Sequence, residues 1–154
     1  MAVMARFALV VVLFAAASAA AADDRRAHVN YMLHCQGCHL PATEGMEGKV
    51  PPMKEFVGWF LHSEEGRELL IRVPDVSQSA LDDVELAELM NWILLTHSRG
   101  QLPEDFRPFS ADEVGQLRGN PEPEPQVTRQ RILEHIAGSH PKLARALRPE
   151  SAES

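Results

Sequence analysis

Two cysteines and a histidine lie close together near the start of the chain, in the stretch Cys35-Gln36-Gly37-Cys38-His39. Residues three apart share a face of a helix, so both thiols can bond to one edge of a flat cofactor. His39 follows directly and can turn its imidazole beneath the same ring. This C-x-x-C-H spacing is typical of covalent haem attachment. The sequence therefore predicts one haem c, bound through Cys35 and Cys38, with His39 as the proximal iron ligand.

Three other roles of these two cysteines are a thioredoxin-like dithiol, half of a zinc site and a structural disulfide. A thioredoxin-like dithiol normally follows a strand of an α/β sheet, whereas the residues before Cys35 have a helical pattern. Zinc would need further nitrogen or sulfur ligands, and none of the remaining candidates shows paired zinc-finger spacing. Those candidates are His28, His34, His62 and His97. We favour haem over all three roles.

The first residues have the three-part pattern of a secretory signal. Met1 to Arg6 carries a positive charge, Phe7 to Ala17 is an unbroken apolar run, and small residues follow up to Ala22. The apolar run is about half of the ~20 residues that a membrane-spanning helix needs. We therefore expect a signal peptide over residues 1–22 and export to the periplasm. Membrane attachment is expected only if the signal is not cleaved.

After this signal the sequence predicts an all-α protein, because no run alternates polar and apolar residues long enough for a strand. The clearest helix is the last of three, because Asp82 and Glu85 form a capping box ahead of a 3.6-residue apolar stripe. Prolines and glycines make Leu40–Lys54 a loop. The three predicted helices span Ala27–Cys38, Glu64–Arg72 and Asp82–Thr96.

The stretch from Arg99 to Pro103 is a predicted boundary. Beyond it, Ser110 and Glu113 begin a short helix that ends at Arg118. A Pro/Glu-rich linker and two more helical segments follow, over Asn120–Pro125, Val127–Ala137 and Lys142–Leu147. We therefore predict a haem domain over residues 23–99 and a C-terminal linker and helical tail over residues 100–154. The tail is too poor in apolar residues for its own core, so it packs on the haem domain, binds a partner or stays loose.

Several residues around the haem motif match the class I c-type cytochromes, which the chain resembles from about Ala27 to Ser98. Tyr31 matches the aromatic residue of that family's first helix, and Ala27 matches the small residue where the first and last helices cross. Trp92 matches the aromatic residue of the last helix. The resemblance implies a small cytochrome c-like helical domain around one haem, with a C-terminal helical extension. It also implies that the carbonyl of Pro51, in Pro51-Pro52-Met53, orients His39.

The chain departs from the family at the sixth iron ligand. Family members usually have Met-Pro shortly before the last helix, but here that segment begins with Val73-Pro74. A valine cannot ligate iron, so Met53, His62 or no protein ligand remain. Methionine would raise the potential and a second histidine would lower it. An open position would bind small gases or peroxide.

Composition narrows the function further. The chain has 154 residues, with 15 Lys and Arg against 22 Asp and Glu and a net charge of -7, so nucleic-acid binding is not expected. No Gly-rich phosphate loop or other catalytic motif is present, so we expect no enzyme. The resemblance implies an exported monohaem electron carrier that cycles between Fe(II) and Fe(III).

We expect its partners to be redox proteins, such as a dehydrogenase, an oxidase or another cytochrome. Acidic residues at the start of the last helix would suit a basic docking surface on such a partner. The alternatives are a gas- or peroxide-binding haem protein, with five-coordinate iron, and a cytochrome subunit of a larger oxidoreductase.

Overall fold

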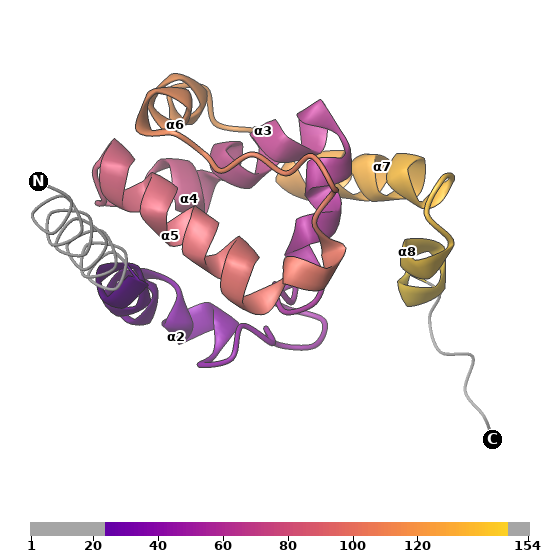
Figure 1. Cartoon of the computed structure of the whole chain (residues 1–154), viewed down its shortest axis with the longest axis horizontal. Coiled ribbons are helices and arrows are strands. Elements are labelled where there is room, and N and C mark those ends of the chain that lie inside the picture. Colours follow the sequence, from indigo (N-terminus) through magenta and orange to yellow (C-terminus); the bar gives the residue numbers. More distant parts are fainter. Residues whose placement is uncertain (1–23, 148–154) are drawn as a thin grey trace, which may run out of the picture.

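The computed structural model describes residues 24–147 (Figure 1). Residues 1–23 and 148–154 are outside the described part, and so the predicted signal peptide over residues 1–22 is too. The described residues are mostly helical and contain no β-strand, which confirms the all-α prediction. None of their helices has the length and apolar character needed to span a bilayer. After a first helix over residues 24–34, the elements are α2 (Gln36–His39), η1 (Val57–His62), α3 (Glu64–Arg72), α4 (Pro74–Ser77), α5 (Asp83–His97), η2 (Arg99–Gln101), α6 (Ala111–Arg118), α7 (Pro125–Ala137) and α8 (Pro141–Ala146).

The first predicted helix is divided in two. It runs over residues 24–34, is interrupted at Cys35 and resumes as the single turn of α2. Cys35 has φ of -124°, far from the helical value near -63°, although its N–H still bonds to the Tyr31 carbonyl at 2.9 Å. The prediction of one continuous helix to Cys38 is therefore wrong. Cys35 therefore lies at the break in the helix and Cys38 lies within α2.

The long helix α5 begins and packs as the sequence predicts. Asp82 Oδ1 accepts from the N–H of Glu85 at 2.8 Å, and Glu85 Oε2 accepts from the N–H of Asp82 at 3.2 Å. Its apolar stripe is buried in the core and consists of Leu86, Leu89, Met90, Ile93 and Leu94. The helix α3 has the predicted bounds, and Ser63 Oγ caps it by accepting from the N–H of Gly66 at 3.0 Å.

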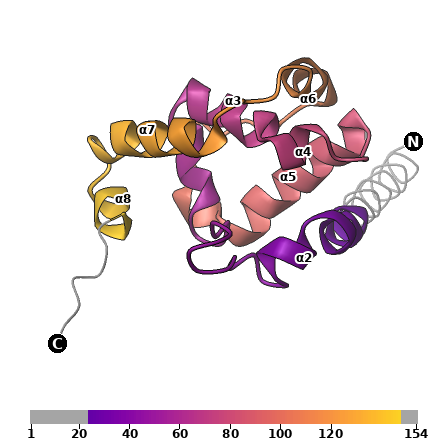
Figure 2. The same ribbon diagram turned by 180° about the vertical axis from the view of Figure 1, so that it is seen from behind.

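The first helix crosses α5 at close range. Ala27 and Tyr31 are buried, and the ring centroids of Tyr31 and Trp92 lie 5.7 Å apart. An ion pair between Arg26 and Glu88 joins the same two helices on the outside. The crossing places the beginning of α2 beside the middle of α5 (Figures 1 and 2).

The described part of the C-terminal tail packs on the rest of the chain. The helix α6 lies against α3 and α5, and α7 lies against α3 and η1, on the side of the molecule away from α2 (Figures 1 and 2). The buried apolar side chains of the tail join the same cluster as those of α3 and α5; they are Phe109, Val114, Ile132, Leu133, Ile136 and Leu143. One core therefore runs through both predicted parts of the chain. Of the three possibilities for the tail, packing on the rest of the chain is the one observed for residues 100–147.

Three short elements were not predicted: η1, α4 and η2. Each has six residues or fewer, too few for an apolar period to be recognised. Long-range contacts hold η1, where the N–H of Gly58 donates to Ser98 Oγ at 2.8 Å. Tertiary contacts rather than local pattern therefore decide these turns.

Candidate functional site

The predicted attachment residues lie together at the end of the first helix. Cys35 is partly buried at the helix break, while Cys38 is exposed on α2, and both are free thiols. Burial, with a smaller contribution from Cys38, raises the pKa of Cys35 to about 11. The structure thus presents two unpaired sulfur atoms on one short turn, followed at once by His39.

His39 ends α2 and turns toward the following loop. Burial lowers the pKa of its imidazole, while the carbonyl of Pro51 and the carboxylate of Asp75 act in the opposite direction. Nδ1 of His39 is buried and makes no complete hydrogen bond within the described residues, although the Pro51 carbonyl lies beside the ring. The carbonyl of Pro51 therefore acts on the pKa of the His39 imidazole, and its role in orienting the ring stays a prediction.

A compact loop makes this approach possible. Leu40 has φ of 63°, which ends α2 and reverses the chain. Gly45 has φ of +70°, and a Cβ there would lie 2.4 Å from the Val50 carbonyl oxygen, so only glycine fits. The N–H of Met46 bonds to the Val50 carbonyl at 2.9 Å and closes the loop. The loop predicted from its prolines and glycines is confirmed.

Aromatic rings line the inner side of the first helix. Trp92 of α5 lies between His28, stacked at 5.2 Å, and His97, whose ring meets it edge-on at 5.1 Å. His97 is partly enclosed, and its Nε2 is buried without a partner among the described residues. The sequence did not predict that His97 packs against Trp92, because a histidine at a helix end is usually solvated.

The turn that carries the thiols is open to the surface at Gly37. A Cβ added at Gly37 would meet no protein atom within 4 Å, so the protein's own packing does not require a glycine there. Within residues 24–147, no three His, Cys, Asp or Glu side chains are grouped so that they could hold a metal ion. Two thiols and one imidazole on a single turn suit a haem better than a lone zinc ion, which binds four ligands.

Comparison with known proteins agrees with this donor set. No family model matches the chain. Two curated proteins do, both named cytochrome c-552 and both from Thermus thermophilus, the second from a named strain of that organism. Each is 30% identical over 117 residues, which cover 64% of this chain and 86% and 76% of the two relatives. The chain belongs to the c-type cytochromes. Its cofactor is accordingly haem c, covalently bound through cysteine, and its role is electron transfer.

The two candidate sixth ligands of the cytochrome, Met53 and His62, have different surroundings. Met53 is partly buried against the core, and its N–H donates to the Thr43 carbonyl at 2.9 Å. His62 Nε2 lies 2.9 Å from the Gln101 carbonyl oxygen, and its ring lies 4.3 Å from that of His140. Because a carbonyl only accepts, His62 Nε2 is the protonated nitrogen in this contact. His62 therefore contacts η2 through Gln101 and the region between α7 and α8 through His140.

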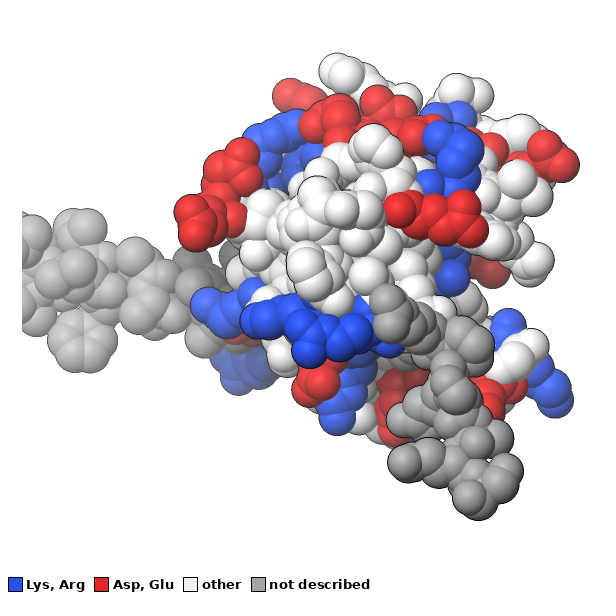
Figure 3. Space-filling model, turned by 90° about the vertical axis from the view of Figure 1, so that its right-hand side faces the viewer, with Lys and Arg blue, Asp and Glu red and all other residues white. Residues whose placement is uncertain are grey.

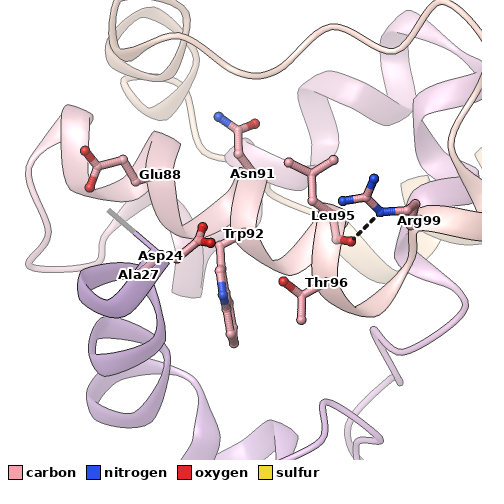
Figure 4. A pocket seen from close by; sticks show the side chains of 8 residues that line it. All are labelled: Asp24, Ala27, Glu88, Asn91, Trp92, Leu95, Thr96 and Arg99. Carbon is pink, nitrogen blue, oxygen red and sulfur yellow. Dashed lines mark hydrogen bonds between the residues drawn. The ribbon is translucent and has the colours of Figure 1, made fainter. Parts of the chain in front are cut away.

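A groove of about 300 Å³ lies where the first helix meets α5 (Figure 4). Its lining consists of Asp24, Ala27, Glu88, Asn91, Trp92, Leu95, Thr96 and Arg99. Neither cysteine nor His39 contributes to it. The groove of this cytochrome is therefore distinct from the attachment site.

Proposed function

We propose that this chain is a class I cytochrome that carries one haem and shuttles single electrons between redox proteins. The observation that supports it is the arrangement of Cys35, Cys38 and His39 on one turn with the Pro51 carbonyl beside the imidazole. When bound, haem c supplies the Fe(II)/Fe(III) couple. The cysteines of the chain would hold the group, and the imidazole of His39 would bind its iron.

Each residue has a definite task in this proposal. Cys35 and Cys38 would hold the haem through two thioethers, and His39 would be the proximal iron ligand. With haem bound, the carbonyl of Pro51 would accept the Nδ1–H of His39, which would fix the tautomer, leave Nε2 for iron and make the ligand more basic. Buried Tyr31 packs against the ring of Trp92 next to the attachment turn.

The sixth position is proposed for Met53, for His62 or for an external ligand, because Val73 has no ligating atom. The variants Met53→Ala and His62→Ala separate the three. If the spectrum of the unaltered protein is low-spin and becomes high-spin in one variant, the residue replaced in that variant is the sixth ligand. A spectrum that is high-spin and sensitive to carbon monoxide in the unaltered protein supports an open position instead.

We also propose export of the protein, with a signal over residues 1–22, a haem domain over residues 23–99 and a tail over residues 100–154. The amino-terminal sequence of protein secreted into a periplasm tests the first part. A start at Ala21 or Asp23 supports cleavage after Ala20 or Ala22. A chain that begins at Met1 and stays in the membrane would contradict it.

Many of the acidic side chains that could bind a basic partner already pair with groups of this chain. Asp83 pairs with Arg118, Glu88 with Arg26, and Glu85 is part of the capping box of α5. Three further acidic residues, on α3, pair with arginines; they are Glu64, Glu65 and Glu68. Both signs of charge also occur together on the side of the molecule near α7 and α8 (Figure 3). We therefore propose a redox partner bound through mixed rather than purely acidic contacts.

The decisive experiment measures the mass of the chain under denaturing conditions, after production in a host able to attach haem. The unaltered chain should carry the mass of one haem. Cys35→Ala and Cys38→Ala should each retain a single thioether at lower yield, and the double variant should carry none. Met46→Ala, in the nearby loop, is the matched control and should keep full haem content. A chain of apoprotein mass, or pigment extracted by acidified acetone, would overturn the proposal.

A further inference from the structure

Two histidines from distant parts of the chain meet with their rings in contact. His62 is the last residue of η1, and His140 lies between α7 and α8. The centroids of the two imidazole rings are 4.3 Å apart, and the ring planes make an angle of 62°. This pair is separate from the attachment turn, whose histidine is His39.

One nitrogen of each ring is fixed by a main-chain carbonyl. His62 Nε2 donates to the Gln101 carbonyl oxygen at 2.9 Å. His140 Nδ1 donates to the Ile136 carbonyl oxygen at 3.0 Å. Each of these nitrogens carries the hydrogen, because a carbonyl oxygen only accepts, and the second nitrogen of a neutral imidazole then has a free lone pair. The free lone pairs are therefore those of His62 Nδ1 and His140 Nε2.

Ser139 agrees with this assignment of the hydrogens. Its Oγ lies 3.2 Å from the Ile136 carbonyl oxygen and 3.0 Å from His140 Nδ1. A hydroxyl that donates to the carbonyl accepts from the imidazole, so Nδ1 keeps its hydrogen. Within residues 24–147, neither His62 Nδ1 nor His140 Nε2 has a hydrogen-bond partner. The fold therefore leaves both lone pairs unused.

The ring of Trp59 packs against both imidazoles. Its centroid lies 5.3 Å from that of His62 and 5.7 Å from that of His140. Both histidines are half-buried. Each imidazole is thus fixed by a carbonyl and by the indole, so little side-chain freedom would be lost when the pair binds a further group. The pair is therefore preorganised for a ligand.

This arrangement has the features of a pair of metal ligands. Histidines that bind metals commonly donate their other N–H to a main-chain carbonyl, as both histidines do here. Two imidazoles bonded at about 2.0 Å to one ion, at a right angle to each other, have ring centroids roughly 4.5 Å apart. The observed 4.3 Å is close to that separation.

The number of ligands favours one kind of metal. In the part of the chain that the structure describes, no third His, Cys, Asp or Glu side chain completes a metal-binding group. Structural zinc is almost always held by four protein ligands in a tetrahedron. Cu(II) prefers tetragonal nitrogen and oxygen sites, in which neighbouring ligands are at right angles, and it binds more tightly than zinc to the same ligands. Two imidazoles with water therefore suit Cu(II) best.

We propose that His62 and His140 form a site for one Cu(II) ion, bound through His62 Nδ1 and His140 Nε2 with water molecules as the remaining ligands. Because His62 belongs to η1 and His140 to the tail, the ion joins these two parts of the chain. The site does not use the attachment motif. A copper ion at this pair leaves Met53 or an external ligand for the sixth position of the iron.

The test titrates cupric ion into the ferric holoprotein and three variants, in a buffer that does not bind copper. Calorimetry measures the stoichiometry and the dissociation constant, and the electron paramagnetic resonance signal of copper shows how many nitrogens are bound. His62→Ala and His140→Ala each remove one ligand. His135→Ala is the matched control, because His135 is an exposed histidine of α7, close to His140 in the sequence.

We expect the unaltered protein to bind one equivalent of copper, with a signal coupled to two nitrogens. His62→Ala and His140→Ala should each bind copper about tenfold more weakly or worse, because each keeps only one of the two imidazoles. His135→Ala should stay within about twofold of the unaltered protein, since it keeps both ligands.

Absence of copper binding would overturn the proposal, and so would equal affinities in His62→Ala, His140→Ala and the unaltered protein. If either variant fails to fold, the signal of the unaltered protein decides: coupling to two nitrogens supports the site, and coupling to fewer overturns it. Absence of covalent haem from the unaltered protein is a different result, since it contradicts the proposed function and not this site. In that event the titration is repeated after alkylation of both thiols.

Discussion

The hydroxyl of Tyr31 donates a hydrogen bond to the main-chain carbonyl of Leu40. Tyr31 lies four residues before Cys35, and Leu40 follows His39 directly, so the bond spans the whole attachment motif. The ring of Tyr31 is fully buried and also contacts Trp92 and His97. The first helix, the motif and α5 are therefore joined at one side chain.

Replacing this tyrosine by phenylalanine should measure the contribution of the hydroxyl apart from that of the ring. Tyr31→Phe keeps the contact with Trp92 but leaves the Leu40 carbonyl without its donor, at a cost of about 1–3 kcal/mol. We expect that loss in the free energy of unfolding of the holoprotein, measured in denaturant. Val29→Ala, on the exposed face of the same helix, is the control and should change it little. A Tyr31→Phe variant as stable as the unaltered protein would contradict this role of the bond.

Tyr31 should also make the protein less stable at high pH. Burial is the main cause that raises its pKa from 10.0 to about 12. A raised pKa in the folded state means that the contribution to stability is complete below pH 10 and is lost as the pH rises through about 12. Because the chain has a single tyrosine, the ultraviolet absorbance of its phenolate measures this titration directly. An apparent pKa near 10 in the folded protein would disprove the expectation.

Asn91 should anchor the beginning of the tail. Its Nδ2 donates to the Phe109 carbonyl at 2.9 Å, and its Oδ1 accepts from the Phe109 N–H at 2.8 Å. Asn91→Ala leaves both main-chain groups of buried Phe109 unpaired, so we expect a loss of about 2 kcal/mol and faster proteolysis between residues 100 and 110. Val84→Ala, at an exposed position of α5, should change neither measurement. Unchanged proteolysis in Asn91→Ala would show that the tail is held elsewhere.

Glu113 should make the stability depend on pH in acid. Arg67, itself buried, donates to both carboxylate oxygens at 2.6 and 2.7 Å and lowers the pKa of Glu113 from its ordinary 4.5. A lowered pKa in the folded state gives stability that is present above pH 4.5 and lost as the pH falls through the folded value. At pH 7, Glu113→Gln should cost about 1.5–3 kcal/mol, and the difference should shrink in acid.

The control for this prediction is Glu65→Gln. Glu65 also pairs with an arginine of the tail, Arg131, but both side chains are at least half exposed. Solvent screens such a pair, so the substitution should cost less than about 1 kcal/mol. Equal effects of the two substitutions would show that the burial of Arg67 does not strengthen its pair with Glu113.

The sequence by itself determined the features that depend on neighbouring residues. The bounds of α3 and the capping box of α5 follow from local hydrogen bonds and a 3.6-residue apolar period. The loop after His39 follows from its prolines and glycines. The attachment motif is equally local, because its chemistry depends only on the order and spacing of Cys35, Cys38 and His39.

Only the tertiary structure decided how distant segments meet. Asn91, within the predicted last helix, binds the main chain of Phe109, and His62 contacts Gln101 and His140. The residues around Arg118 do not indicate its contacts with Ser77, Ser79 and Leu81. Such contacts join residues 18 to 78 positions apart, and local periodicity carries no information about which distant groups will pack together.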